Sequence, residues 1–223
     1  MKTFKPRLDS LPEPQRLLWP ELRQVPGNFV LYGGTAVALR LGHRASLDFD
    51  LFSSDPLDAD ALYRTIPFLV NSTPLQRGLD TVTALVERRG TVKISFFGGI
   101  QIGCIDPPEL TDDGVILVAS PRDLLGTKLK VLLQRVEAKD YLDIAALLQS
   151  QIPLAEGLGA AQALYQEQFP PCEALKALVY FEGGDLERLE AEVKSYLTIA
   201  VRAFQGPVPR INKASAVSLT IQS

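Results

Sequence analysis

The residues best suited to chemistry in this chain are two aspartates, Asp48 and Asp50, in the run LDFDLF over residues 47–52. The run alternates apolar and polar positions, which is the period of a β-strand, so both carboxylates should face the same side. Two ionised carboxylates this close repel each other by roughly 1–4 kcal/mol at surface-like dielectric. A hard divalent cation, Mg²⁺ or alternatively Mn²⁺, would relieve that repulsion. A solvated edge strand with acids on its wet side is the other interpretation.

A glycine-containing turn precedes the two acids. Residues 28–32 (NFVLY) read as a short strand, Gly33, Gly34 and Thr35 follow, and 35–41 reads as an apolar helix. Glycines at a strand-to-helix turn let the backbone approach a ligand closely, and the N–H groups of a helix start bind phosphate. The pattern predicts a phosphate cradle formed by Gly33, Gly34 and Thr35 beside the acids, with a simple turn as the alternative.

The second half of the chain carries a lysine within an apolar stripe. On a predicted helix over 121–135, Lys128 lies inside the apolar arc, whereas Lys130 lies on the opposite, polar face. The arc is formed by Leu124, Leu125, Leu129, Val131 and Leu132. An inward-facing lysine is costly unless it meets an anion, which a bound triphosphate or an acidic site would provide. Snorkelling of Lys128 to the rim is the other interpretation.

Two aspartates follow on the next predicted helix, 138–149. Asp140 falls between Ile144 and Leu147 on the helical wheel, and Asp143 lies at the border of the same apolar face. Their position predicts that both carboxylates face inward. Asp140 in the first turn would also favour the helix dipole, which is the structural alternative.

The elements around these residues indicate an α+β fold. The strand 47–52 should send Leu47, Phe49 and Leu51 into a core, and 81–87 with 91–97 should form a hairpin. We predict a mixed α/β region over 1–119, a helical region over 120–205 and a loose tail, or an arm that orders on a partner, over 206–223. Further predicted segments are helices 14–24 (interrupted by Pro20), 57–67, 154–168, 172–181 and 186–205, and a strand at 115–118.

Composition excludes several classes of function. The net charge is −3, which argues against nucleic-acid binding by bulk charge, and the single histidine excludes sites built from several imidazoles. Two cysteines suggest neither a disulfide framework nor a zinc cluster. Apolar stretches are too short and too often interrupted by charge to span a bilayer, and the N-terminus has no apolar signal core, so we expect a cytoplasmic protein that does not bind membranes.

The motifs together resemble a known family. The stretch LYGGTAVALRLGHRASLDFDLF (31–52) resembles the opening motif of the polymerase-β-type nucleotidyltransferases, and in detail that of the AbiEii/AbiGii-type toxin nucleotidyltransferases. The later DLLGTKLKVLLQRVEAKDYLDIAALL (123–148) resembles the second signature block of that family, and ALVYFEGGDLERL (177–189) resembles its C-terminal helical region. The resemblance covers about residues 25–205.

The resemblance implies a polymerase-β-like core, a small mixed sheet with helices, followed by an all-helical half. It implies an enzyme that moves a nucleoside monophosphate from a nucleoside triphosphate to an acceptor hydroxyl. Asp48 and Asp50 would hold Mg²⁺, and Lys128 and Asp140 would be catalytic. The nucleotide would be bound by Gly33, Gly34, Thr35, Arg44, Lys128 and Asp143. The implied acceptor is RNA, with the tRNA 3′ end as a candidate, and the implied biological partner is a cognate antitoxin.

One departure from the superfamily concerns a third carboxylate, which a later strand usually supplies to activate the attacking hydroxyl. The candidate strand TVKISFF (91–97) has none, and Glu87, Asp106 or Asp140 would have to replace it. The departure keeps open a non-catalytic nucleotide-binding or interaction module on the same fold. An Asp-X-Asp phosphatase is disfavoured by the polar run GHRAS before the acids, and an Asp-X-Asp sugar transferase would leave the second block unexplained.

Overall fold

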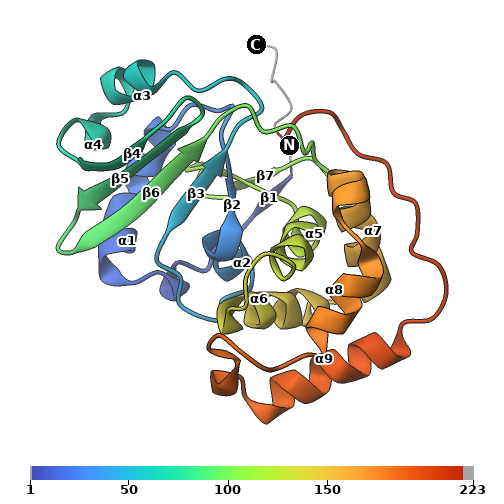
Figure 1. Ribbon diagram of the computed structural model, residues 1–223. Coiled ribbons are helices and arrows are strands. Elements are labelled where there is room, and N and C mark those ends of the chain that lie inside the picture. The colour runs from blue at the N-terminus through green and yellow to red at the C-terminus, as the bar shows by residue number, and fades with distance from the viewer. Residues whose placement is uncertain (1, 218–223) are drawn as a thin grey trace. The chain divides into compact units, whose positions relative to one another are not determined.

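The computed structural model describes residues 2–217, and the chain divides into two units. One unit contains residues up to Ser120 together with the segment that begins at Ala214, and the other contains Pro121–Lys213. The first is built on a mixed β-sheet and the second on helices (Figure 1). The α+β class expected from the sequence is therefore confirmed.

The sheet of the first unit contains eight strands within the described residues, in the order β1-β7-β8-β2-β3-β6-β5-β4. Figure 1 shows β2, β3 and β6 side by side in its middle. β3 runs antiparallel to β2 and parallel to β6, and β2 runs parallel to β8. The strands are β1 (Thr3–Phe4), β2 (Val30–Tyr32), β3 (Phe49–Phe52), β4 (Thr73–Arg77), β5 (Thr81–Glu87), β6 (Thr91–Phe97), β7 (Glu109–Thr111) and β8 (Leu117–Val118).

The β5–β6 hairpin matches its predicted bounds, 81–87 and 91–97, in full. Its turn contains Arg89 at φ 54° and Gly90 at φ 144°, so the glycine supplies the backbone conformation that lets the chain reverse. β6 then pairs on its other side with β3, which places the hairpin directly beside the strand that follows Asp48.

The helices of the first unit include α2 (Gly33–Leu41), which follows β2 without a loop. Its apolar residues, among them Val37 and Leu39, are fully buried, and Gly42 at φ 65° ends it in the left-handed conformation. Pro20 ends the predicted helix 14–24 early, because a proline in a helix interior removes a hydrogen bond. The other helices are α1 (Glu13–Leu18), α3 (Ala59–Thr65), α4 (Pro67–Val70) and the 3₁₀ turns Leu8–Ser10 and Trp19–Gln24.

The second unit is helical throughout. α5 packs closely on α7 through glycines: a Cβ on Gly126 would lie 3.0 Å from the Ala161 nitrogen, and one on Gly157 would lie 2.5 Å from a methyl of Leu125. Small residues at these positions let the two helix backbones approach each other. The helices are α5 (Pro121–Val131), α6 (Ala138–Gln149), α7 (Leu154–Tyr165), α8 (Pro171–Leu178) and α9 (Ala191–Ala203), with 3₁₀ turns Gln166–Gln168 and Leu186–Arg188.

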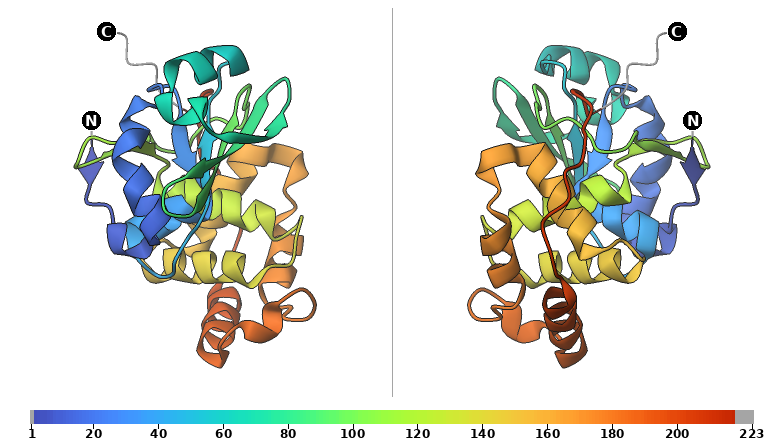
Figure 2. Two further views of the ribbon diagram at one scale, coloured as in Figure 1. Left: turned by 90° about the vertical axis from the view of Figure 1, so that its left-hand side faces the viewer. Right: turned by 90° about the vertical axis from the view of Figure 1, so that its right-hand side faces the viewer.

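The segment after α9 packs against its own unit instead of forming the loose tail expected over 206–223. It runs back along α7 (Figure 2), where the Pro209 carbonyl lies against Gly159 and Lys213 Nζ donates to the Leu164 carbonyl at 3.0 Å. In the first unit, Ala214 forms a β-bridge with Cys104, and Val217 is fully buried. Backbone hydrogen bonds and an apolar anchor thus hold residues that composition marks as unstructured. Residues 218–223 lie outside the described part of the chain.

Within residues 2–217, none of the helices combines the length and the apolar character that crossing a membrane requires.

Candidate active site

Asp48 and Asp50 lie at the start of β3, at the centre of the sheet. β3 begins at Phe49, one residue after Asp48, and not at Leu47 as predicted. The expectation that Leu47 points into the core is wrong, since its side chain is 60% exposed, whereas Phe49 and Leu51 are fully buried. The reason is a long-range contact: the Leu47 carbonyl accepts from Gln15 Nε2 at 2.8 Å, which takes that peptide out of the strand ladder.

The two carboxylates face the same side of the sheet. Asp50 is paired in register with Ser95 of β6, so the two side chains share a face. Lys93 precedes Ser95 by two residues and lies on the same face, and its Nζ is 3.1 Å from Asp48 Oδ2. The chain therefore brings two acids and one lysine together on one side of β3 and β6, as the strand period predicts for the acids.

Asp50 also lies directly against the glycine turn. Gly33 has φ +75°, and a Cβ added there would be 2.8 Å from Asp50 Oδ2. Two features require glycine at position 33. An L side chain is strained at that φ, and a Cβ would crowd the Asp50 carboxylate. Tyr32, the residue before it, pairs with Asp50 across β2 and β3, which fixes the register of turn and acid.

Thr35 sits in the first turn of α2, almost completely buried. Its hydroxyl hydrogen-bonds to the Asp48 carbonyl and lies 2.8 Å from Ser46 Oγ. Thr35 thereby anchors the segment that carries Asp48. Gly34, the other member of the predicted cradle, is half-buried beside Gly33.

The basic residues near the turn differ in their contacts. Arg44 is half-buried, and its Nη1 donates to the adjacent Ala45 carbonyl at 2.9 Å. Arg40 instead bridges to the sheet, with Nη1 2.7 Å from Glu109 Oε2 and Nε donating to the Ala119 carbonyl. These bonds give Arg40 a structural role.

The strand that was expected to supply a third carboxylate, β6, places a hydroxyl group beside Asp50. Ser95, the register partner of Asp50, is buried, and its Oγ lies 3.2 Å from Thr83 Oγ1 on β5. Glu87 is four residues further along β5 than Thr83, which is roughly 13 Å of strand, and it accepts from Thr91. Across the described chain, three or more His, Cys, Asp or Glu side chains nowhere gather in a way that could hold a metal ion.

In the helical unit, Lys128 is buried and paired with both aspartates of α6. Its Nζ is 2.8 Å from Asp140 Oδ1 and 2.6 Å from Asp143 Oδ2, with 6% of the lysine side chain and none of either aspartate exposed. The helical-wheel prediction for Lys128 is thus confirmed, and the anion it meets is supplied by the protein. Lys130, on the polar face, donates instead to the Gln168 carbonyl.

Arg135, an exposed residue, contacts this cluster from its edge and was missed by the sequence reasoning. Its Nε donates to Asp140 Oδ2 at 2.8 Å and its Nη2 to Oδ1 at 3.1 Å, a two-point contact. Burial alone would raise the pKa of Asp140, but the hydrogen bonds from Arg135 and the charge of Lys128 outweigh it and hold that pKa below its usual value. The available signal was an arginine five residues before an inward-facing acid.

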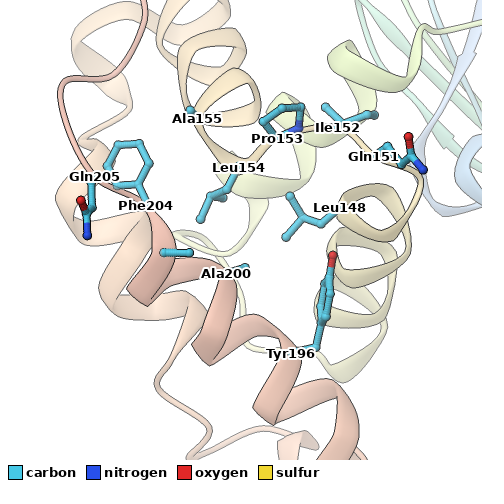
Figure 3. A pocket seen from close by; sticks show the side chains of 11 residues that line it. Leu148, Gln151, Ile152, Pro153, Leu154, Ala155, Tyr196, Ala200, Phe204 and Gln205 are labelled. Carbon is cyan, nitrogen blue, oxygen red and sulfur yellow. The ribbon is translucent and has the colours of Figure 1, made fainter.

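A separate groove of about 410 Å³ lies within the helical unit, between the end of α6, the start of α7 and α9 (Figure 3). Leu148, Ile152, Tyr196 and Phe204 line it, and none of its lining residues carries a charge. A triphosphate needs cations or backbone N–H groups, so this groove does not suit one.

Comparison with known proteins places these features in one family. A family model described as "Nucleotidyl transferase AbiEii toxin, Type IV TA system" matches residues 16–192, which include Gly33, both acids of β3 and the Lys128 cluster. The protein aq_aa25 of Aquifex aeolicus, described as uncharacterized, is 29% identical over 188 residues, covering 79% of this chain and 88% of its own.

Solved structures share the fold. A putative nucleotidyltransferase from H. pylori superimposes with TM-score 0.58 at 15% identity, covering 84% of this chain and 91% of its own. MenT4, a nucleotidyltransferase toxin from Mycobacterium tuberculosis H37Rv, superimposes with TM-score 0.56 at 14% identity, covering 85% and 81%. At these identities the likeness establishes the architecture.

Replacing Gly33 by alanine should displace the Asp50 carboxylate. Gly114 is the matched control, because its φ of +70° imposes the same backbone strain while a Cβ there would meet nothing within 4 Å. We expect both variants to lose about 1–2 kcal/mol of stability in urea unfolding. Only Gly33→Ala should also bind Mn²⁺ more weakly in an electron paramagnetic resonance titration, and equal Mn²⁺ affinities would contradict the contact.

Replacing Lys128 by methionine should destabilise the helical unit strongly, because it leaves two buried carboxylates without their cation. We expect a loss of about 3–5 kcal/mol, against less than about 1 kcal/mol for Lys130→Met on the polar face. Urea unfolding followed by circular dichroism measures both. Similar losses for the two variants would show that the buried ion pairs do not hold this unit together.

The lowered pKa of Asp140 predicts acid sensitivity. In the unfolded chain this carboxyl titrates near about pH 3.9, whereas the folded chain holds it ionised to lower pH. Its contribution is therefore complete above that unfolded pKa and declines as pH falls through the folded one. We expect melting temperatures of Asp140→Asn, although lower throughout, to fall less steeply below pH 5 than those of the parent. Parallel curves would rule this linkage out, and Asp60→Asn, at an exposed acid, should keep the parent's slope.

Proposed function

Because the chain belongs to the AbiEii nucleotidyl transferase toxin family, and is therefore a nucleotidyltransferase, we propose that it transfers a nucleoside monophosphate to an acceptor hydroxyl in a Mg²⁺-dependent reaction. The observation that carries the proposal is the placement of Asp50 against the Gly33 turn, with Asp48 on the same face. This arrangement joins a site for a cation to a backbone that a phosphate can approach. Family membership favours the enzyme over the non-catalytic binding module.

The residues present fit a hard divalent cation. Asp48 and Asp50 offer carboxylate oxygens from one face of a strand, and oxygen donors of this kind suit Mg²⁺, with Mn²⁺ as a substitute. When bound, the ion would neutralise charge developing on the phosphates. The two aspartates would hold it, and Thr35 would keep the Asp48 backbone in place for that task.

The nucleotide would be bound by backbone groups and cations. Gly33 and Gly34 would let the chain approach the triphosphate, with Thr35 at the start of α2 and Arg44 as a nearby positive charge. The acceptor oxygen would form a bond to the α-phosphorus while the bond from that phosphorus to the bridging oxygen breaks. Pyrophosphate leaves, and the proton of the acceptor hydroxyl passes to water.

The helical unit contributes the charged cluster of Lys128, Asp140 and Asp143. We include Lys128 and Asp140 among the catalytic groups and Asp143 among the nucleotide-binding ones, on the strength of their place in the family's second motif. The two ion pairs of Lys128 support a role in which the lysine is held in a fixed orientation. Asp140 would orient the triphosphate or the acceptor.

The acceptor and the biological role extend the proposal. We propose RNA as the acceptor, with the 3′ end of tRNA as its first candidate, and a cytoplasmic toxin whose effect a cognate antitoxin neutralises. The family description names a toxin of a type IV toxin–antitoxin system, and MenT4 is likewise described as a toxin. Both descriptions support the role.

The metal role predicts a large loss of activity when either acid is neutralised. Incubation with each α-labelled nucleoside triphosphate, Mg²⁺ and total cellular RNA should label RNA with the parent protein. Asp48→Asn and Asp50→Asn should lower the rate by at least ~10²–10³-fold, as removal of a major electrostatic stabiliser does. Asp60→Asn, an exposed acid paired with Arg77, is the control and should label RNA normally. Near-normal labelling by Asp48→Asn would refute the proposed metal site.

A further inference from the structure

Lys93 forms an ion pair with one of the two acids of the site, and the sequence motifs give it no role. It lies on β6, beside β3, with Nζ 3.1 Å from Asp48 Oδ2, and its side chain is 41% exposed while that of Asp48 is 43% exposed. Both partners are thus accessible, so a ligand can reach the pair without unfolding the sheet. Lys93 is also the only charged residue in the strand TVKISFF.

The other basic residues of the same hairpin serve a different purpose. Arg88 is bound by Glu21, with Nε 2.6 Å from Oε1, and Arg89 by Glu13 at 3.2 Å. Both pairs join the hairpin to the N-terminal helical segment, and neither acid belongs to the site. Lys93 alone among these three cations contacts an acid that the site uses.

The carboxylate ligands of the site favour a single metal ion. The register partner of Asp50 is Ser95, so the strand that would supply a third carboxylate contributes a hydroxyl, and two residues away it contributes a positive charge. One divalent ion on two carboxylates beside an ammonium already leaves the protein groups and ion with a small positive charge. A second divalent ion would need a further carboxylate ligand, and the register neighbours Ser95 and Thr83 offer only hydroxyl groups.

We propose that Lys93 is the built-in cation of this site: Asp48 and Asp50 hold one divalent ion, and the Lys93 ammonium takes the place of a second. The inference rests on the proposed metal role of the two aspartates. Lys93 is a positioning residue that holds Asp48 before the ion arrives and limits how tightly the ion binds. When a nucleotide binds, its negative triphosphate offsets the positive charge that the lysine and the ion share.

Mn²⁺ binding tests this proposal without reference to turnover. Free Mn²⁺ is followed by electron paramagnetic resonance, first with protein alone and then with a non-hydrolysable nucleoside triphosphate analogue at saturation. We expect one Mn²⁺ per chain in the analogue complex. Without nucleotide, Lys93→Met should bind Mn²⁺ about fivefold more tightly, because a like charge near the ion is removed. Lys93→Arg, which keeps the charge, should bind Mn²⁺ with the parent's affinity.

Arg89→Met is the matched control, since it removes a cation of the same hairpin that pairs with Glu13 away from the site, and its Mn²⁺ affinity should equal the parent's. Two Mn²⁺ ions per parent complex, or an unchanged affinity in Lys93→Met, would overturn the inference while leaving the metal role of the acids intact. Mn²⁺ binding that is absent, or that Asp48→Asn does not weaken, would instead overturn the proposed metal role together with this inference.

Discussion

The site depends on the space that Gly33 leaves beside Asp50. A Cβ at Gly33 would lie only 2.8 Å from a carboxylate oxygen of Asp50, at a backbone conformation that side chains avoid. The contact exists because β2 leads into α2 without a loop and pairs with β3 so that Tyr32 faces Asp50. The positions of the acids, the glycine turn and the start of α2 therefore all depend on the β2–β3 register. A shift of that register by one residue would turn Asp50 to the other face of the sheet and place Phe49 or Leu51 against the turn.

Each unit contains a pair of aspartates whose negative charges are compensated by basic side chains. The two units differ in how far these ion pairs are buried. In the sheet unit Lys93 contacts Asp48 at the surface, where both side chains are partly exposed and water screens the pair. In the helical unit Asp140 and Asp143 are fully buried, and Lys128 and Arg135 satisfy them with several short contacts. An accessible pair exchanges partners readily, whereas a buried one fixes geometry. The first arrangement suits a ligand that binds and dissociates, and the second suits charged groups that must keep a fixed orientation.

The sequence predicted those parts whose signals are local. The hairpin of β5 and β6 was placed correctly because two β-rich stretches flank a short turn that contains glycine, and the inward face of Lys128 followed from helical spacing alone. The short strands β1, β4 and β7 gave no such signal; β4 includes a proline, and all of its residues are exposed. Leu47 was misplaced because the side chain of Gln15, distant in sequence, takes its carbonyl. The contact between Lys93 and Asp48 likewise depends on the β3–β6 pairing, which joins segments far apart in the chain that no local pattern spans.

The register of the sheet gives a physical reason why a third carboxylate is missing from β6. Ser95 occupies its register position, buried beside Thr83, so a charged group there would need a partner or water that these two hydroxyls do not replace. Lys93, two residues earlier and partly exposed, carries charge at low cost because its ammonium stays in contact with solvent and with Asp48. β6 therefore has an uncharged residue at the buried position of Ser95 and a lysine at the partly exposed position 93. Compared with a strand that supplies a third carboxylate, β6 gives the site one negative charge fewer and one positive charge more. Under the proposed metal role, that change would lower the site's demand for divalent cations while keeping two oxygen donors for one ion.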